Sequence, residues 1–281
     1  MYLQKTWIYG NRIEVRKYHT IRYNVKGEVR GRRKKPTSEQ KELANENASR
    51  NRLRRLMINN FGDGDIHLTL TYKRECRPTP EGSKELIRKF FRKLRAYYRQ
   101  HGQEFKWILV KEDGGKAIHH HMVMNDVDGL LGFLRKAWPY GGVHAVPLYE
   151  NQDFGGLADY FVKETKESYK KHKENGEPYR VRYSCSRNLQ QPIEKTEVVS
   201  ASAWRKEVKV PPTLQREGYQ LEKGSEYAGT DIYGFPFQTY TFIRYGDERG
   251  GEKKQKKTIK QRNKGKQRKQ QAKGEQTWQK D

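Results

Sequence analysis

The stretch over residues 107–124 constrains the fold most, because its pattern predicts a β-hairpin. The runs W-I-L-V and A-I-H-H-H-M-V-M flank D-G-G-K at 113–116, whose glycines supply a turn. Side chains alternate between the two faces of a strand. His119 and His121 therefore share one face, and His120 lies on the other face among apolar residues. This pattern predicts that His120 points into a core.

The face that carries His119 and His121 is a candidate metal site. If residues 113–116 form the loop, Glu112 pairs with Ala117 and lies on the same side as these two histidines. One carboxylate and two imidazoles on one surface would bind a divalent metal and leave positions open for substrate. The alternative is that three consecutive histidines are a fortuitous run. An alternating pair with a carboxylate across a Gly-Gly turn favours the metal site.

The charge of the chain indicates a polyanionic partner. The 281 residues carry a formal net charge of +25, and the pI is near 9.9. Nucleic acid is the commonest partner of such a protein, and the body stays basic without the C-terminal tail. Cys76 and Cys185 are too isolated for a disulfide framework or a cysteine zinc site. No run is long enough to span a membrane and no signal core begins the chain, so we expect a soluble, cytoplasmic protein.

The order of elements around the hairpin predicts the fold class. Besides the hairpin, the patterns predict a strand at 66–72, a helix at 81–101, a short helix at 127–138, a strand at 143–149 and a helix at 153–171. Strand, helix, two strands, helix, strand is the order of ferredoxin-like and RRM-like folds. We therefore predict an α+β protein in which helices cover one face of an antiparallel sheet. The other face would stay free to hold a polymer.

The chain divides into four predicted parts. Residues 1–60 contain a hairpin and a basic helix that opens at Thr37, where T-S-E-Q has capping-box spacing. Residues 61–178 form the core just described, and residues 179–245 form a β-rich extension. Residues 246–281 are rich in Lys, Gln and Arg and almost devoid of apolar side chains. Such a segment buries too little surface to fold, which predicts a disordered arm that binds nucleic acid.

A second chemical element lies in the helix predicted at 153–171. In A-D-Y-F-V-K-E, Tyr160 falls outside the apolar stripe of its own helix, and Lys163 is its i+3 neighbour. Tyr160 is therefore a candidate nucleophile. The alternative is a structural role, because the chain has 18 tyrosines and most of them must be structural.

Together these motifs resemble those of the HUH endonucleases, specifically the rolling-circle replication initiators (Rep proteins) of plasmids and phages with a single catalytic tyrosine. L-T-L-T-Y, the histidine pair with an upstream Glu and the helical Tyr-x-x-Lys occur in the family's order, over roughly Phe61 to Lys166. Y-S-C-S-R-N-L at 183–189 is similar to phage-type members. The chain departs from the pattern at His120, where the family usually has an aliphatic residue, and carries Glu164 in place of a second tyrosine.

The resemblance implies a role for each matched residue. The residues implied for DNA binding are Thr69, Thr71 and Arg187. The implied metal ligands are His119, His121 and Glu112. The implied catalytic residues are Tyr160 and Lys163.

The resemblance also implies a reaction, which is metal-dependent nicking of single-stranded origin DNA through a 5′-phosphotyrosine link, with later rejoining of the strand. The cofactor would be Mn²⁺ or Mg²⁺, and the two imidazoles favour Mn²⁺. The chain has no G-x-x-x-x-G-K-[ST] motif, so a host helicase would open the duplex and a host DNA polymerase would extend the 3′-hydroxyl in the bacterial cell.

Two alternatives stay open. One is a relaxase or single-tyrosine transposase of the same fold. The other is a non-catalytic, basic RRM-like module, although the aromatic R-G-F-x-F-V strand of such modules is absent.

Overall fold

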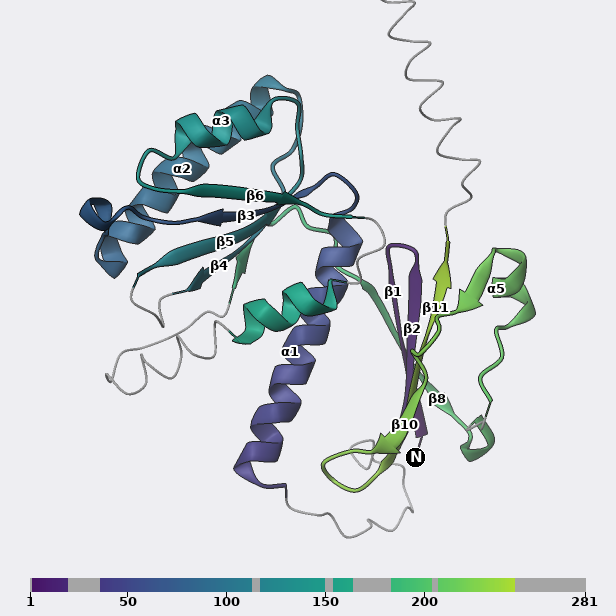
Figure 1. Cartoon of the computed structure of the whole chain (residues 1–281). Helices are drawn as coiled ribbons and strands as arrows, with labels where there is room; N and C mark the ends of the chain where they lie inside the picture. The colour runs from purple at the N-terminus through teal and green to yellow at the C-terminus, as the bar shows by residue number, and fades with distance from the viewer. Residues whose placement is uncertain are drawn as a thin grey trace, which may run out of the picture.

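The structure is a computed structural model, and it describes residues 2–19, 36–112, 117–149, 154–163, 183–203 and 207–245. Two antiparallel sheets and their helices make up this part of the chain (Figure 1), which confirms the predicted α+β class. The predicted arm at 246–281, the tight turn at 113–116 and the end of the helix predicted at 153–171 lie outside the described residues.

The first sheet holds the predicted core. Its strand order is β6-β3-β5-β4-β7, and all its pairings are antiparallel. The strands are β3 (Ile66–Leu70), β4 (Trp107–Glu112), β5 (His119–Met124), β6 (Val143–Pro147) and β7 (Ser184–Cys185). Helix α2 (Pro80–Gln100) follows β3, with the short 3-10 turn η1 (Arg74–Cys76) between them, and helix α3 (Leu130–Ala137) follows β5. The predicted order of strand, helix, two strands, helix and strand is therefore confirmed.

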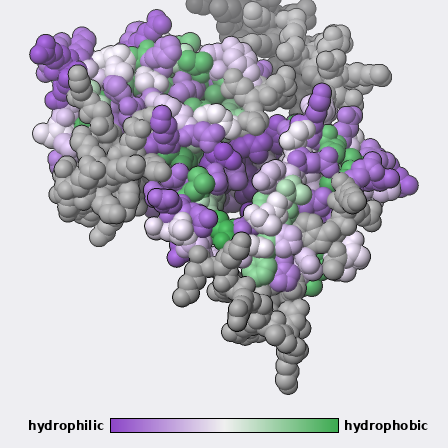
Figure 2. All heavy atoms as spheres, turned by 60° about the horizontal axis from the view of Figure 1, so that its bottom comes forward, coloured by the Kyte–Doolittle hydropathy of each residue, from purple (hydrophilic) through white to green (hydrophobic). Residues whose placement is uncertain are grey.

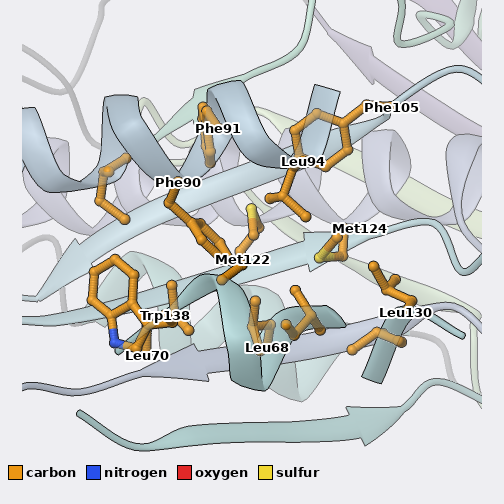
Figure 3. Packing of buried hydrophobic residues seen from close by; sticks show 14 of the residues in the cluster. Leu68, Leu70, Phe90, Phe91, Leu94, Phe105, Met122, Met124, Leu130 and Trp138 are labelled. Atoms are coloured by element: carbon orange, nitrogen blue, oxygen red, sulfur yellow. The ribbon is translucent and has the colours of Figure 1, made fainter. Parts of the chain in front are cut away.

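One face of this sheet packs against α2 and α3 (Figure 3). Apolar side chains of β3 and β5 meet an aromatic and aliphatic stripe of α2, together with Trp138. His120 is buried on this face, where its Nε2 lies 2.9 Å from the hydroxyl of Tyr72 and 3.0 Å from that of Ser83. The prediction that His120 faces the core is confirmed, and these hydrogen bonds offset the burial of its polar ring.

The other face of the sheet is also covered, in part, by helices. Helix α1 (Ser38–Asn60) and the helix at 155–163 lie beside this sheet (Figure 1). Their side chains form a second core with those of β4 and β5. Helices therefore lie on both faces of the sheet, whereas the sequence predicted them on one. The reason is that β4 and β5 direct Ile108, Val110 and Val123 to this side, and such apolar side chains must be buried.

Helix α1 begins as predicted. Thr37 forms a capping box with Gln40, in which the Thr37 hydroxyl accepts from the Gln40 N–H at 3.2 Å and the Gln40 side chain accepts from the Thr37 N–H at 3.1 Å. These bonds satisfy donors that the first turn of a helix leaves free.

The second sheet joins the two ends of the described chain. Its order is β10-β11-β2-β1-β8, with β9 also paired to β11. Its strands are β1 (Tyr2–Tyr9), β2 (Arg12–His19), β8 (Ile193–Val199), β9 (Tyr219–Leu221), β10 (Tyr227–Thr230) and β11 (Pro236–Arg244). Two short helical turns lie between these strands, η2 (Ala201–Ala203) and α5 (Pro212–Arg216). The predicted N-terminal hairpin thus pairs with strands of the predicted extension, and the four-part division of the chain stays a prediction.

No helix among the described residues combines the length and the apolar character needed to cross a bilayer. Figure 2 shows one face of the molecule, on which hydrophilic side chains predominate over hydrophobic ones.

The contact between Gly141 and the end of β3 leads to a stability prediction. A Cβ on Gly141 would lie 2.1 Å from the carbonyl oxygen of Thr71, which accepts a hydrogen bond from Trp138. We expect Gly141→Ala to lower the free energy of unfolding by at least about 2 to 3 kcal/mol, because the backbone must shift. Urea unfolding measures this change. Gly132→Ala is the control, because nothing lies within 4 Å of its added methyl group in α3. Equal stabilities of the two variants would contradict the prediction.

Candidate active site

Three elements bring Tyr160 and the three predicted metal ligands together on the second face of the first sheet. His121 Nε2 lies 3.0 Å from Glu112 Oε2 and 3.1 Å from the hydroxyl of Tyr160. The Tyr160 hydroxyl also donates to Glu112 Oε2 at 3.4 Å, and His119 Nδ1 lies 3.5 Å from that same oxygen. We call Glu112, His119, His121 and Tyr160 the tyrosine–histidine cluster.

The register of the hairpin differs from the prediction. Glu112 pairs with His119 and not with Ala117, so the connection between the strands is longer than 113–116. The shift is two residues, and side chains repeat every two residues along a strand. Glu112 therefore keeps the face that the sequence predicted for it.

Thr69 on β3 orients His121. The two residues are cross-strand partners, and the Thr69 hydroxyl lies 3.3 Å from His121 Nδ1. A hydroxyl both donates and accepts, so Thr69 can pair with either neutral tautomer of the ring. Both ring nitrogens of His121 thus have a partner, which fixes the plane of the imidazole in front of Glu112 and Tyr160.

The environment sets the charge of the cluster. Burial alone would raise the pKa of Glu112, but the hydrogen bond from His121 and the nearby His119 outweigh burial and hold the pKa below its usual value. Burial lowers the pKa of His121, and the hydrogen bond to Glu112 offsets this only in part. At neutral pH the cluster therefore pairs an ionised carboxylate with a neutral imidazole, the forms in which both groups bind a metal.

His67 on β3 also belongs to this face, and the sequence reasoning did not single it out. Its ring centroid lies 5.9 Å from that of His121 and 5.7 Å from that of Phe161. Burial, together with His121 and His144, lowers the pKa of His67 to about 4, so the ring is neutral at physiological pH. The available signal was the alternation of I-H-L-T-L, which places His67 on the face of Thr69.

Besides Thr69, three predicted site residues lie outside the cluster. Lys163 is exposed, one turn along the helix from Tyr160. The Thr71 hydroxyl accepts from the N–H of Gly142 at 3.0 Å. Arg187 follows β7, which pairs with the start of β4, whereas Glu112 is at the end of β4.

The predicted ligands contact one another. Among the described residues, no group of three or more His, Cys, Asp or Glu side chains is arranged to hold a metal ion as it stands. Instead, Glu112 Oε2 is the shared partner of His119 and His121, at 3.5 and 3.0 Å. Neighbouring ligands of an octahedral ion with bonds of ~2.1 Å are about 3 Å apart. A carboxylate and two imidazoles are donors of the kind that a divalent ion takes, and an ion bound here would replace the hydrogen bonds within the cluster.

Residues 65–185 match a family model of replication-associated proteins, the one described under the name ORF2. The match runs from the start of β3 to β7, covers somewhat less than half of the chain and includes the whole tyrosine–histidine cluster. It indicates a role in DNA replication and is consistent with a rolling-circle replication initiator. No curated protein and no solved structure matches the chain.

Proposed function

We propose that this protein initiates rolling-circle replication by nicking single-stranded origin DNA, with Tyr160 as the nucleophile. The observation that carries the proposal is the position of the Tyr160 hydroxyl, 3.1 Å from His121 Nε2 on a sheet that matches a replication-associated family. A helix separate from the hairpin supplies this phenol. A purely structural role would not explain why the Tyr160 hydroxyl lies beside an ionised carboxylate and a neutral imidazole, which are the forms of these groups that bind a metal.

The reaction is a transesterification at phosphorus. The phenol oxygen of Tyr160 forms a bond to the phosphorus while the bond to the 3′-oxygen breaks, which gives a 5′-phosphotyrosine and a free 3′-hydroxyl. An unperturbed phenol has a pKa of about 10, so it needs a proton acceptor at neutral pH. Glu112 is a metal ligand in this scheme and its pKa is held low, so water takes the phenol proton, and the departing 3′-oxygen takes up a proton. Attack by a 3′-hydroxyl reverses the step and rejoins the strand.

Other residues would manage the charge of the phosphodiester. His119, His121 and Glu112 would hold Mn²⁺ or Mg²⁺, which when bound neutralises charge on the non-bridging oxygens. Lys163 is exposed one turn from Tyr160 and would face the developing negative charge. Thr69 and Thr71 would lie along the bound strand near the cluster. A host helicase and polymerase would open the duplex and extend the 3′-hydroxyl.

The full chain tests this proposal directly. Single-stranded oligonucleotides tiled over the replicon that encodes the protein are incubated with it and Mn²⁺, then separated on a denaturing gel. We expect an adduct that survives denaturation on one sequence only, a released fragment with a 3′-hydroxyl, and loss of both with EDTA. Calorimetric titration of Mn²⁺ without DNA is a second readout. The absence of adduct on every oligonucleotide, with DNA binding intact, would support the non-catalytic module instead.

The contact of Thr69 with His121 gives a prediction for metal binding. We expect Thr69→Val to weaken Mn²⁺ binding about 10-fold, because a partner behind a metal-binding histidine orients the ring. Thr71→Val is the matched control, because its hydroxyl contacts the Gly142 N–H and no histidine. Calorimetric titration should show unchanged Mn²⁺ affinity for the control. Equal losses in both variants would mean that Thr69 does not act through His121.

A further inference from the structure

A row of basic side chains lies along the outer side of α2. Lys84, Arg88, Arg92, Arg95 and Arg99 are all exposed and follow one another at intervals of three or four residues. This spacing places them on one face of a helix, over a length of about 22 Å at 1.5 Å per residue. We call these five residues the α2 basic row.

The α2 basic row has no acidic counterpart within the described residues. No described carboxylate forms an ion pair with any of the five side chains, and Arg95 instead lies over the ring of Phe91 at 5.8 Å. Some arginines on other elements are paired, such as Arg12 with Glu222 and Arg55 with Glu14. Like charges three and four residues apart repel one another. The row therefore does not stabilise its own helix, and it suits an anionic partner.

A second element extends the row. Arg187, from the loop after β7, lines a groove together with Arg95, Arg99 and Trp107 at the C-terminal end of α2. Arg187 is more than eighty residues away from α2 in the sequence, so helical periodicity does not account for this convergence. Among the described residues that line this groove, the carboxylate is that of Glu104, which accepts a hydrogen bond from the Asn188 side chain at 3.3 Å.

We propose that the α2 basic row and Arg187 bind the phosphate backbone of duplex DNA next to the nicked strand. The aromatic rings of α2 are not available to unpaired bases, because Phe90 and Phe91 are buried and Tyr97 stacks on Phe133 at 4.1 Å. Proteins that bind single strands without sequence preference stack the bases on exposed rings, whereas guanidinium groups on a straight helix suit backbone phosphates.

The position of α2 explains what this contact would do. α2 packs on the face of the sheet opposite the tyrosine–histidine cluster, so the few nucleotides at Tyr160 cannot reach the α2 basic row. One DNA molecule would therefore meet the protein twice, with its cut strand at Tyr160 and its flanking duplex at α2. Only the reference to the nicked strand rests on the proposed function, since duplex binding needs no nicking.

The test compares two full-length variants with the same loss of charge. The row variant carries Arg88→Gln, Arg92→Gln, Arg95→Gln and Arg99→Gln. The control carries Lys41→Gln, Lys195→Gln, Arg216→Gln and Lys223→Gln, which are exposed and lie outside α2. Binding to a fluorescent 25-base-pair duplex is measured by anisotropy at several salt concentrations. We expect the Kd of the row variant to rise at least about 10-fold near 150 mM salt and its salt slope to fall by about 3 to 4, at roughly 0.9 per phosphate contact. The control should change less than about 3-fold.

The outcomes separate this proposal from the proposed function. Equal weakening in both variants would reduce the effect to net charge and overturn the proposal. Loss of single-stranded binding with duplex binding intact would overturn it as well. If the row variant unfolds at a lower temperature, Arg95→Gln with Arg99→Gln alone should still lower the salt slope by about 2. Adduct formation on short single-stranded oligonucleotides should survive in the row variant, so failure of nicking would be a separate result.

Discussion

Replacing Tyr160 with phenylalanine is expected to abolish the covalent protein–DNA adduct, with a loss of at least about 10³-fold in nicking rate. The substitution removes only the hydroxyl, which lies 3.1 Å from His121 and 3.4 Å from Glu112. The ring keeps its edge-to-face contact with His121, whose centroid is 5.0 Å away. The fold and the affinity for Mn²⁺ should therefore stay close to those of the unchanged protein.

The matched control for this prediction is Tyr149→Phe. Tyr149 lies just after β6 and is 56% exposed, so its hydroxyl is a surface group and not part of the tyrosine–histidine cluster. A labelled oligonucleotide on a denaturing gel measures both the adduct and the released fragment. Normal nicking by Tyr160→Phe, or loss of nicking in Tyr149→Phe alone, would exclude Tyr160 as the nucleophile.

The sequence predicted the faces of the strands better than their register. The period of two placed Glu112, His119 and His121 on one side, and this survived a register error of two residues because the error preserves parity. His120 was assigned to the core by the same rule. Exact pairing depends on the length of the connection, which local alternation does not determine.

Contacts between distant segments could not be predicted from local patterns. Periodicity identified α1 and the N-terminal hairpin as elements, but it did not indicate that α1 covers the second face of the first sheet. Nor did it indicate that β1 lies between β2 and β8, which are more than 170 residues apart. The position of Tyr160 depends on how its helix packs on β4 and β5, so the sequence suggested its role only through resemblance to a family.

The buried ion pair between Glu14 and Arg55 is expected to stabilise the joining of α1 to the second sheet. Arg55 Nη2 lies 2.5 Å from Glu14 Oε1, Arg55 Nε lies 2.8 Å from Oε2, and both side chains are nearly inaccessible, at 11% and 13% exposure. Loss of one partner leaves an uncompensated buried charge. We therefore expect Glu14→Gln to lower the free energy of unfolding by about 3 kcal/mol.

The same pair should make stability fall in acid. Burial alone would raise the pKa of Glu14, but the hydrogen bonds and charge of Arg55 outweigh it and hold the pKa below its usual value. The unfolded chain, with a glutamate pKa of about 4.3, binds the proton first, so the contribution is complete above that pH and disappears as the pH falls through the folded pKa. Urea unfolding between pH 7 and pH 3 should show a smaller acid dependence for Glu14→Gln.

Glu85→Gln, which breaks the exposed pair of Glu85 with Lys89, is the control and should change stability by less than about 0.5 kcal/mol. A similar loss in both variants would mean that burial does not strengthen the Glu14–Arg55 pair, and other contacts, such as the hydrogen bond from the Gly10 N–H to Asn59, would then hold α1 to the second sheet.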